Sequence, residues 1–314
     1  MRAKRAIASV GFPYRAPEVP SGVTVPEAPS KLEANYDTAW AREAPARAVR
    51  RLMQAGPLRL FVKVVADPEI DGLDRLADYR PAKGEDPPAL IFTPNHHSHL
   101  DTGLCLMAIP EPWRSKIVVG AAADYFFTTR LSAATSALML NAIPIDRETV
   151  SRKSSDFAKQ LVDEGWSLLL FPEGGRSPDG WGQPFKGGAA YLSARTGAPI
   201  VPVYIDGAGA IFGKGMKRLK PGRTRVVFGH PMPPVDGENT RRYNERVEQA
   251  VTELGDEALS DWWGARQRAA ARQNPMLTGP EYRGWRRQWA LSEHRKLGKA
   301  GQRTRQKRTW PKFD

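Results

Sequence analysis

The sequence predicts an α/β protein with a mixed, largely parallel sheet flanked by helices, an N-terminal helical pair and a basic C-terminal extension. Short apolar runs alternate with stretches of helical periodicity along the middle of the chain, which is the pattern of α/β proteins. The chain has 314 residues, of which 41% are hydrophobic, so it can bury a sizeable core. Its positive charge is concentrated in the last 51 residues, 264–314, which indicates an extension separate from that core.

Residues 1–45 hold six prolines and little periodicity, and we expect an extended Pro-rich arm. Residues 46–84 follow as an amphipathic helical segment and linker. Apolar residues between Val49 and Val65 recur at helical spacing with Arg and Lys between them, and Gly56-Pro57 divides the run into two short helices. Such basic amphipathic helices commonly lie in a membrane interface. Packing of the same apolar stripes on the rest of the protein explains the pattern equally well.

Strands are expected where short apolar runs end at turn residues, and helices where apolar positions recur every three or four residues. The expected strands are 89–92, 116–120, 166–171, 200–205 and 225–228. The expected helices are 102–108, 151–164 and 187–196. The last of these helices opens on glycines, which allow a helix to pack close to a sheet.

Three of the five histidines, His96, His97 and His99, fall within four residues, and Asp101 follows closely. Three chemistries fit this spacing. His96 and Asp101 can form an imidazole base oriented by a carboxylate. His97 can be the base of an HHxxxD pattern, as in condensation-type acyltransferases, although Gly usually follows Asp there and Thr102 stands here. His97, His99 and Asp101 have metal-ligand spacing, resembling the HxHxDH motif of metallo-β-lactamase-like hydrolases. That pattern needs a histidine after the aspartate and further ligands downstream, so we expect no metal site.

The pairing of His96 with Asp101 has a geometric consequence. Five residues on an α-helix rotate a side chain by about 140°, so the two cannot share one helical face. We therefore expect His96 in the turn before a helix and Asp101 in the first helical turn, where the helix dipole favours a carboxylate. Asp101 can then accept a hydrogen bond from one imidazole nitrogen and leave the other nitrogen available as a base.

A glycine-rich loop follows the expected strand 166–171. Gly174 and Gly175 allow backbone amides to approach a ligand closely, and Arg176 offers a planar fork for phosphate oxygens. A strand followed by such a turn is common on its own, and the loop gains meaning only beside the histidine segment.

Together these segments resemble the glycerophospholipid acyltransferases, the family of 1-acylglycerol-3-phosphate O-acyltransferases. Four blocks match in the family's order: Asn95-His96 with Asp101 (NHx4D), residues 143–147 (a block ending in Arg), residues 171–177 (FPEGTRS) and residues 200–203 (an apolar block with Pro). Gly175 stands where the third block of the family has Thr. The resemblance covers about residues 85–235, which it identifies as an acyltransferase catalytic domain.

The resemblance implies the roles of individual residues. His96 and Asp101 would be catalytic, Arg147 and Arg176 would bind phosphate, and Glu173 would contact the glycerol part of the acceptor. Gly174 would belong to the same substrate-binding loop. For Arg147, a surface salt bridge with a neighbouring acidic residue is the alternative interpretation.

The expected reaction is transfer of a fatty acyl group from a thioester to the free hydroxyl of 1-acylglycerol-3-phosphate, which forms phosphatidate. Acyl-CoA or acyl-acyl carrier protein would be the co-substrate, with no cofactor. Glycerol-3-phosphate, or another lysolipid or amino-lipid, is the alternative acceptor. A non-catalytic lipid-surface binding protein is the alternative outside the enzymes.

Residues 236–314 are expected to form a C-terminal helical and basic tail. From residue 264 to 314 there are 14 Lys or Arg against three Asp or Glu, so +11 of the formal net charge of +13 lies there. Tryptophans are interleaved with these cations, a mixture that suits an anionic membrane surface. A solvated tail is the alternative, and nucleic acid is an unlikely partner because no segment resembles a base-reading module.

No stretch reaches the roughly 20 apolar residues of a membrane-spanning helix, and the N-terminus shows no signal-peptide core. We therefore expect a cytoplasmic protein that is peripheral on the inner face of the cell membrane, because its lysophospholipid acceptor resides in a bilayer.

Overall fold

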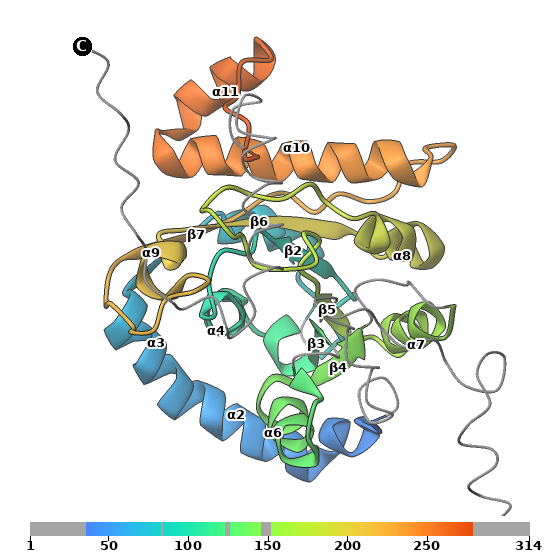
Figure 1. Ribbon diagram of the computed structural model, residues 1–314. Coiled ribbons are helices and arrows are strands. Elements are labelled where there is room, and N and C mark those ends of the chain that lie inside the picture. Colours follow the sequence, from blue (N-terminus) through green and yellow to red (C-terminus); the bar gives the residue numbers. More distant parts are fainter. Residues whose placement is uncertain (1–35, 83, 123–125, 146–151, 279–314) are drawn as a thin grey trace, which may run out of the picture.

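A seven-stranded sheet forms the centre of the protein in the computed structural model, which describes residues 36–82, 84–122, 126–145 and 152–278 (Figure 1). The strands are β1 (Pro68–Asp71), β2 (Ile91–Pro94), β3 (Ile117–Ala122), β4 (Ala142–Ile145), β5 (Ser167–Leu169), β6 (Ile200–Asp206) and β7 (Thr224–Phe228). Their order is β1-β7-β6-β2-β5-β3-β4. Strands β2 to β6 are mutually parallel, β7 is antiparallel to β6, and β1 is parallel to β7. The predicted mixed, largely parallel sheet is confirmed.

The helices cover both faces of this sheet. They are α2 (Ala44–Met53), α3 (Arg59–Ala66), α4 (Asp101–Ala108), α6 (Arg130–Leu140), α7 (Arg152–Asp163), α8 (Gly188–Thr196), α9 (Ala208–Phe212), α10 (Thr240–Leu259) and α11 (Trp262–Ala270). Short 3₁₀ turns are η1 (Ala39–Arg42), η3 (Leu73–Tyr79) and η4 (Trp113–Lys116). Each predicted strand and helix is present, with ends that differ by at most two residues.

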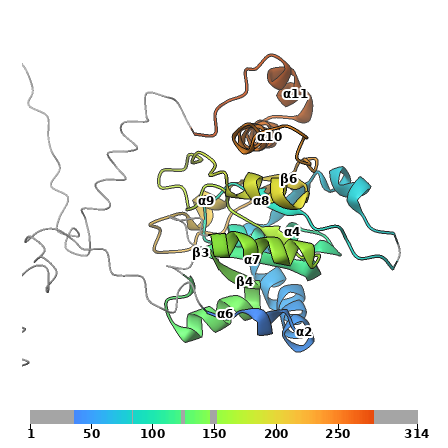
Figure 2. The same cartoon turned by 90° about the vertical axis from the view of Figure 1, so that its right-hand side faces the viewer.

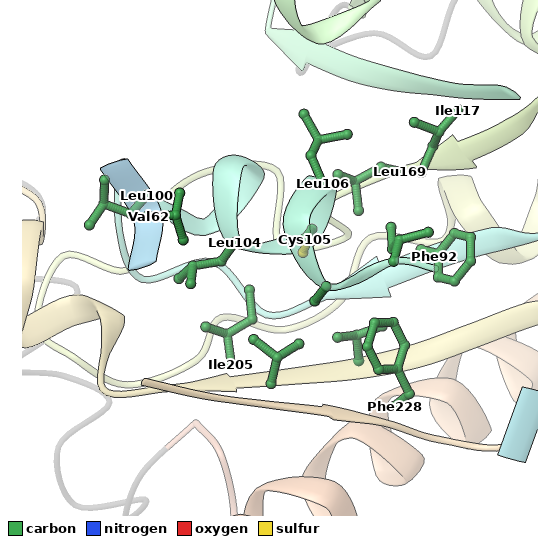
Figure 3. Packing of buried hydrophobic residues seen from close by; sticks show 14 of the residues in the cluster. Val62, Phe92, Leu100, Leu104, Cys105, Leu106, Ile117, Leu169, Ile205 and Phe228 are labelled. Carbon is green, nitrogen blue, oxygen red and sulfur yellow. The ribbon is translucent and has the colours of Figure 1, made fainter. Parts of the chain in front are cut away.

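Two large hydrophobic clusters hold most of the helices on the sheet, and a smaller third cluster packs α6 on β3 and β4. One face packs α3, α4, η3 and α9, and the close view in Figure 3 shows Leu104, Cys105 and Leu106 of α4 beside Phe92 and Phe228 of the strands. The opposite face packs α7, α8 and α10. As a result α2 and α3 lie on the opposite side of the sheet from α10 and α11 (Figures 1 and 2).

Two strands, β1 and β4, and two helices, α6 and the short α9, were not predicted. Strand β1 is an edge strand with two acidic residues in four, and β4 is the opposite edge and contains Pro144, which edge strands tolerate. Strand β1 is therefore not an apolar run, and β4 is an apolar run interrupted by proline. Helix α6 has little amphipathic character, although Thr129 and Ser132 form a capping box at its start. That spacing of two hydroxyl residues was the available signal for a helix beginning here.

The N-terminal helical pair is present, joined by a π-helical turn, η2 (Gln54–Leu58), that contains Pro57. The chain therefore stays helical where a division was predicted. Val62 and Val65 are buried against the core, whereas Leu60 and Val64 of the same helix are 65% and 68% exposed. One stripe of α3 packs on the rest of the protein, as the packing interpretation expects. Another apolar stripe faces outward, as the membrane-interface interpretation expects.

Arg50 fastens α2 to α6. Its buried guanidinium donates hydrogen bonds to the carbonyl oxygens of Ala137 (3.2 Å) and Leu138 (2.8 Å) near the end of α6, and to that of Ala41. Carbonyls at a helix C-terminus lack partners within the helix and attract a cation. Burial lowers the pKa of Arg50 to about 10. Helix α6 is thus held in a fixed position beside β3 and β4.

Several predictions concern residues outside the described ranges, namely most of the Pro-rich arm, Arg147 and the basic tail from residue 279 onward. Within the described ranges, no helix is long and apolar enough to cross a membrane.

Candidate active site

The candidate site lies at the carboxyl ends of two neighbouring parallel strands. Strand β2 ends at Pro94, just before His96, and strand β5 is followed by the glycine-rich loop of residues 172–177. The two strands pair directly, with Phe92 opposite Leu169. Because parallel strands end at the same edge of a sheet, the histidine segment and the loop meet there.

His96 and Asp101 form the predicted pair. Nδ1 of His96 is 2.8 Å from Oδ2 of Asp101. Asp101 is fully buried and is the first residue of α4, and His96 lies in the turn before it. The same Oδ2 atom also accepts hydrogen bonds from the backbone N–H groups of His97 (2.7 Å) and Ser98 (2.8 Å). The carboxylate therefore shapes the turn and fixes the orientation of the imidazole, leaving Nε2 as the ring nitrogen able to take a proton.

The imidazole is also held from the side. Its ring stacks on Phe171, with 4.1 Å between ring centroids and 29° between ring planes. The His96 side chain is 18% exposed and lines a cleft, so it is restrained and still reachable.

Asn95 positions the turn by extending the sheet. The buried amide donates a hydrogen bond to the carbonyl of Ile205 (3.0 Å) and accepts one from the N–H of the same residue (2.7 Å). A side chain thus takes the place of the next backbone pair between β2 and β6. The chain is free to turn away from the sheet immediately before His96.

We expect Asn95→Ala to destabilise the fold by about 2–4 kcal/mol, because it leaves one buried donor and one buried acceptor of Ile205 without a partner. Urea denaturation followed by circular dichroism measures this. The matched control is Asn239→Ala, which removes an exposed helix cap from α10 and should cost about 1 kcal/mol. Equal losses in the two variants would contradict the role assigned to Asn95.

Glu173 is 3% exposed and joins the two segments of the site. Its Oε1 accepts a hydrogen bond from the N–H of His96 (2.9 Å), and its Oε2 accepts one from the N–H of Gln183 (2.8 Å). The N–H of Ser177 also donates to the carbonyl of His96 (2.8 Å). Glu173 therefore fastens the glycine-rich loop to the turn that carries His96, a role the sequence did not indicate. Its contact with the glycerol of the acceptor stays a prediction.

The two glycines of the loop differ in what they require. Gly174 has φ +69°, a left-handed conformation that favours glycine, and a Cβ there would lie 2.7 Å from Nζ of Lys186, whose flexible side chain would have to move. Gly175 has no atom within 4 Å of an added Cβ, and its carbonyl accepts a hydrogen bond from the Gln183 side chain. The space that the family fills with Thr is therefore open in this protein.

We expect Gly175→Thr to fold normally and to keep kcat/KM within about threefold of the parent, since the hydroxyl enters open space without moving a neighbour. Thermal unfolding and steady-state kinetics check both points. A gain of more than about tenfold would show that the missing hydroxyl limits the reaction.

The remaining histidines occupy different positions. His99 lines the cleft, contacts the guanidinium of Arg176 and packs on Phe212, with 4.7 Å between ring centroids. Burial, and then the charge of Arg176, lower the pKa of His99. His97 contacts Asp101 only through its backbone N–H, and its buried Nε2 has no hydrogen-bond partner in the described structure. Burial lowers the pKa of His97 as well. Of these three histidines, His96 is the one whose ring is oriented by the Asp101 carboxylate, as a general base requires.

A cleft of about 220 Å³ opens beside His96. Its lining includes Arg176 and the exposed side chains of Lys186 and His99. The rest of the lining is mostly apolar and comes from β3, β4, α6, α7, α8 and the end of β5: Val119, Ala121, Leu140, Ile145, Ala158, Leu170, Ala189 and Leu192. The described residues that line it include no Asp or Glu. The cleft thus combines cationic groups with a larger apolar surface.

Residues 75–206 match the family model described as Acyltransferase. With the His96–Asp101 geometry and the four sequence blocks, this match shows that the chain carries a domain of the acyltransferase family. Strands β1 and β7, which belong to the same sheet, lie outside the matched residues.

Two relatives illustrate the similarity. The chain is 32% identical over 168 residues to 1-acyl-sn-glycerol-3-phosphate acyltransferase BAT2, chloroplastic, of Brassica napus, covering 52% of this chain and 44% of that protein. It is 33% identical over 121 residues to the 1-acyl-sn-glycerol-3-phosphate acyltransferase of Pseudomonas aeruginosa, covering 37% and 46%. The chain spans less than half the length of these curated relatives.

The crystal structure of the 1-acyl-sn-glycerophosphate (LPA) acyltransferase PlsC from Thermotoga maritima has the same fold. The superposition has a TM-score of 0.52 at 22% sequence identity and covers 72% of this chain and 84% of that one. This similarity supports the α/β architecture, and the sequence matches support the family.

Proposed function

We propose that the protein transfers a fatty acyl group from a thioester donor to the free hydroxyl of 1-acylglycerol-3-phosphate and forms phosphatidate. The observation that carries this proposal is the His96–Asp101 pair, whose histidine lines a cleft that has both cationic and apolar walls. A phosphorylated glycerolipid and an acyl chain require those two kinds of environment. The names of the relatives point to the same acceptor.

The chemistry follows from the geometry of the pair. Nε2 of His96 takes the proton of the acceptor hydroxyl as its oxygen attacks the thioester carbonyl, so a C–O bond forms and the C–S bond breaks. The imidazolium then gives its proton to the departing thiolate. Asp101 stabilises the imidazolium through the Nδ1 contact, as the carboxylate does in serine hydrolases. The acceptor's hydroxyl stands where those enzymes have a serine, and no acyl-enzyme is required.

The test is thiol release from oleoyl-CoA and oleoyl-acyl carrier protein by the purified protein, with 1-acylglycerol-3-phosphate, with glycerol-3-phosphate and with no acceptor. We expect release that depends on 1-acylglycerol-3-phosphate and product that co-migrates with phosphatidate. Release with glycerol-3-phosphate but not with 1-acylglycerol-3-phosphate would identify glycerol-3-phosphate as the acceptor. Lipid binding without release from either donor would point to a non-catalytic lipid-surface protein.

The apolar part of the cleft is proposed to hold the acyl chain of the donor. Gly120 of β3 lines it, and an added Cβ there would lie 2.5 Å from both Cδ1 of Ile145 and Cδ2 of Leu170. These side-chain ends also line the cleft and can move only by taking space from it.

We therefore expect Gly120→Ala to lower kcat/KM for oleoyl-CoA about tenfold more than for decanoyl-CoA, since a change of one methyl group in an apolar pocket has effects of this size. A series of acyl-CoA donors measures the ratio, and the KM of the acceptor serves as the internal control. An unchanged ratio would place the acyl chain elsewhere.

Membrane contact is proposed through the outward stripe of α2 and α3. Leu52, Leu60 and Val64 are 73%, 65% and 68% exposed, and Arg51, Arg59 and Lys63 lie exposed among them. Apolar side chains flanked by cations favour an anionic bilayer surface. On this proposal the protein is peripheral on the inner face of the cell membrane, and the basic residues 264–314 add attraction.

Flotation with vesicles of phosphatidylcholine and phosphatidylglycerol tests this. We expect Leu60→Gln with Val64→Gln to reduce recovery with the vesicles. Leu259→Gln, a comparably exposed leucine on α10 across the sheet, is the control and should float normally. Recovery of the double variant equal to that of the parent would exclude this surface, and recovery unaffected by removing residues 264–314 would exclude the tail.

A further inference from the structure

The glycine-rich loop lines the cleft beside His96 and contains two consecutive glycines, Gly174 and Gly175. Glycine has more backbone freedom than any other residue. No atom beyond the chain neighbours of Gly175 lies within 4 Å of a Cβ added there, so side-chain packing does not fix the backbone at that position. The geometry of the loop near His96 therefore depends on hydrogen bonds from other segments.

Gln183 holds this loop at two points. Its side-chain Nε2 donates a hydrogen bond to the carbonyl of Gly175 (2.9 Å), and its backbone N–H donates one to Oε2 of Glu173 (2.8 Å). Oε1 of Glu173 accepts a hydrogen bond from the N–H of His96 (2.9 Å). Gln183 therefore contacts the loop on both sides of Gly174, and a single carboxylate joins it to the backbone of His96.

The chain next to Gln183 is held in turn by residues that follow α11. The N–H of Gly182 donates a hydrogen bond to the carbonyl of Leu277 (2.8 Å), and a Cβ at Gly182 would lie 3.3 Å from Cβ of Leu277. The Leu277 side chain lies over Gly255 of α10, where an added Cβ would be 2.9 Å from its Cδ2 atom, and it packs against the hydrophobic cluster on that face of the sheet. Packing on α10 thus fixes the position from which Leu277 holds Gly182.

Contacts with Asp256 of α10 return the chain after α11 to this position. Asp256 is buried, and its Oδ1 and Oδ2 accept hydrogen bonds from Nη2 (2.8 Å) and Nε (2.7 Å) of Arg268 in α11. Its Oδ2 also accepts one from Nδ2 of Asn274 (3.0 Å). Bidentate hydrogen bonds between Arg and a carboxylate are among the stronger ones in proteins. A continuous set of contacts therefore runs from Asp256 through Asn274 and Leu277 to Gly182.

We infer that Gln183 is a positioning residue of the active site and that residues 274–278 hold it in place. This inference rests on the proposed function. Residues 274–278 lie outside residues 75–206, which match the family model, and none of the four sequence blocks contains Gln183. Gln183 fixes the backbone on both sides of Gly174 and, through Glu173, the backbone N–H of His96. The imidazole thereby keeps its direction towards the cleft.

Steady-state kinetics of Gln183→Leu tests the effect on the reaction. We expect kcat to fall about 10–100-fold, because small displacements of a catalytic group have effects of this size. The melting temperature should change by less than about 5 °C, since one partly exposed side-chain hydrogen bond is lost. Gln249→Leu is the matched control, because it removes an exposed hydrogen bond to Glu253 on α10 and should keep parental kcat. Parental kcat in a folded Gln183→Leu variant would overturn the inference.

A second substitution separates positioning of the loop from a general structural role. Threonine at position 175 restricts the backbone of the loop through its branched side chain, and Gly175 is not in the left-handed region that would exclude it. We therefore expect Gly175→Thr combined with Gln183→Leu to have at least about threefold higher kcat than Gln183→Leu alone, because the two changes act on the same loop. Equal kcat in these two variants would show that Gln183 does not act through the glycine-rich loop, and would overturn the inference.

Hydrogen–deuterium exchange keeps the inference independent of turnover. The N–H of His96 donates to Glu173, and that of Ser177 donates to the carbonyl of His96, so both amides report on the joined loop and turn. In Gln183→Leu and in Leu277→Ala they should exchange about fivefold faster than in the parent, because local opening becomes easier. Met276→Ala, which changes a neighbouring side chain that is 62% exposed, should leave their exchange unchanged.

The exchange experiment also distinguishes failure of this inference from failure of the proposed function. If the parent transfers no acyl group to any acceptor, faster exchange in Gln183→Leu and Leu277→Ala still supports the positioning role, and the proposed function alone fails. Parental exchange in Leu277→Ala would overturn the role of residues 274–278, and parental exchange in both variants would overturn the whole inference.

Discussion

His96→Ala is expected to lower kcat/KM for acyl transfer by about 10²–10⁴-fold, the range that a positioned general base contributes. The Nε2 atom facing the cleft is the group that takes the acceptor proton, and alanine offers no substitute. The fold should survive, because the His96 side chain is 18% exposed and Asp101 keeps its hydrogen bonds from the backbone of His97 and Ser98. Thiol release under saturating acceptor measures the loss, and the melting temperature shows whether the variant is folded.

The matched control is His230→Ala, which removes an exposed histidine outside the cleft and should retain parental activity. A folded His96→Ala variant with full turnover would exclude His96 as the base. The same experiment on His97→Ala decides the alternative base, which we expect to be dispensable because its side chain makes no hydrogen bond to Asp101.

The central part of the fold was predictable because its strands and helices carry their own signals. The strands in the interior of the sheet are short apolar runs that end at turns, and α7 has strong helical periodicity. The edge strand β1 lacks such a run and is held by its pairing with β7, whereas β4 is a short apolar run interrupted by Pro144. The local sequence pattern cannot show a pairing partner that lies 156 residues away, as Thr224 does from Pro68.

The site also contains residues that local sequence reveals and residues whose positions depend on distant parts of the chain. His96 and Asp101 are close in sequence, and helix geometry alone placed one before α4 and the other in its first turn. Glu173 contacts residues far away in the sequence, so its position depends on the pairing of β2 with β5. The sequence showed Lys186 only as a lysine before two glycines. In the structure its side chain passes over Gly174 and lines the cleft.

The structural role of Glu173 also changes how a substitution there should be interpreted. Both carboxylate oxygens accept hydrogen bonds from backbone N–H groups, one of them that of His96. A loss of activity on removing Glu173 therefore has a sufficient cause in the displaced histidine. Only a rise in acceptor KM at constant kcat would support contact of Glu173 with the glycerol.

Asp101→Asn is expected to lower kcat by about 10²–10⁴-fold, a loss comparable to that from removing the base. The substitution keeps the shape of the side chain and removes its charge. If the amide oxygen takes the place of Oδ2, it can accept the same three hydrogen bonds, but the imidazolium formed during transfer loses its counter-charge. If the amide NH₂ faces His96 instead, Nδ1 must accept, the proton moves to Nε2, and the base is blocked.

The free energy of unfolding of Asp101→Asn shows whether a loss of kcat comes from the chemistry or from unfolding of the protein. Oδ1 of Asp101 is buried and has no hydrogen-bond partner in the described structure, so an NH₂ group there would be unsatisfied and should cost about 1–3 kcal/mol. Urea denaturation measures this cost, and Asp236→Asn at an exposed position is the control. A stable Asp101→Asn variant with parental kcat would mean that the carboxylate only shapes the turn and that His96 needs no negative partner. Loss of kcat in a folded variant would show that Asp101 does more than shape the turn, either through its charge or through the tautomer it fixes on His96.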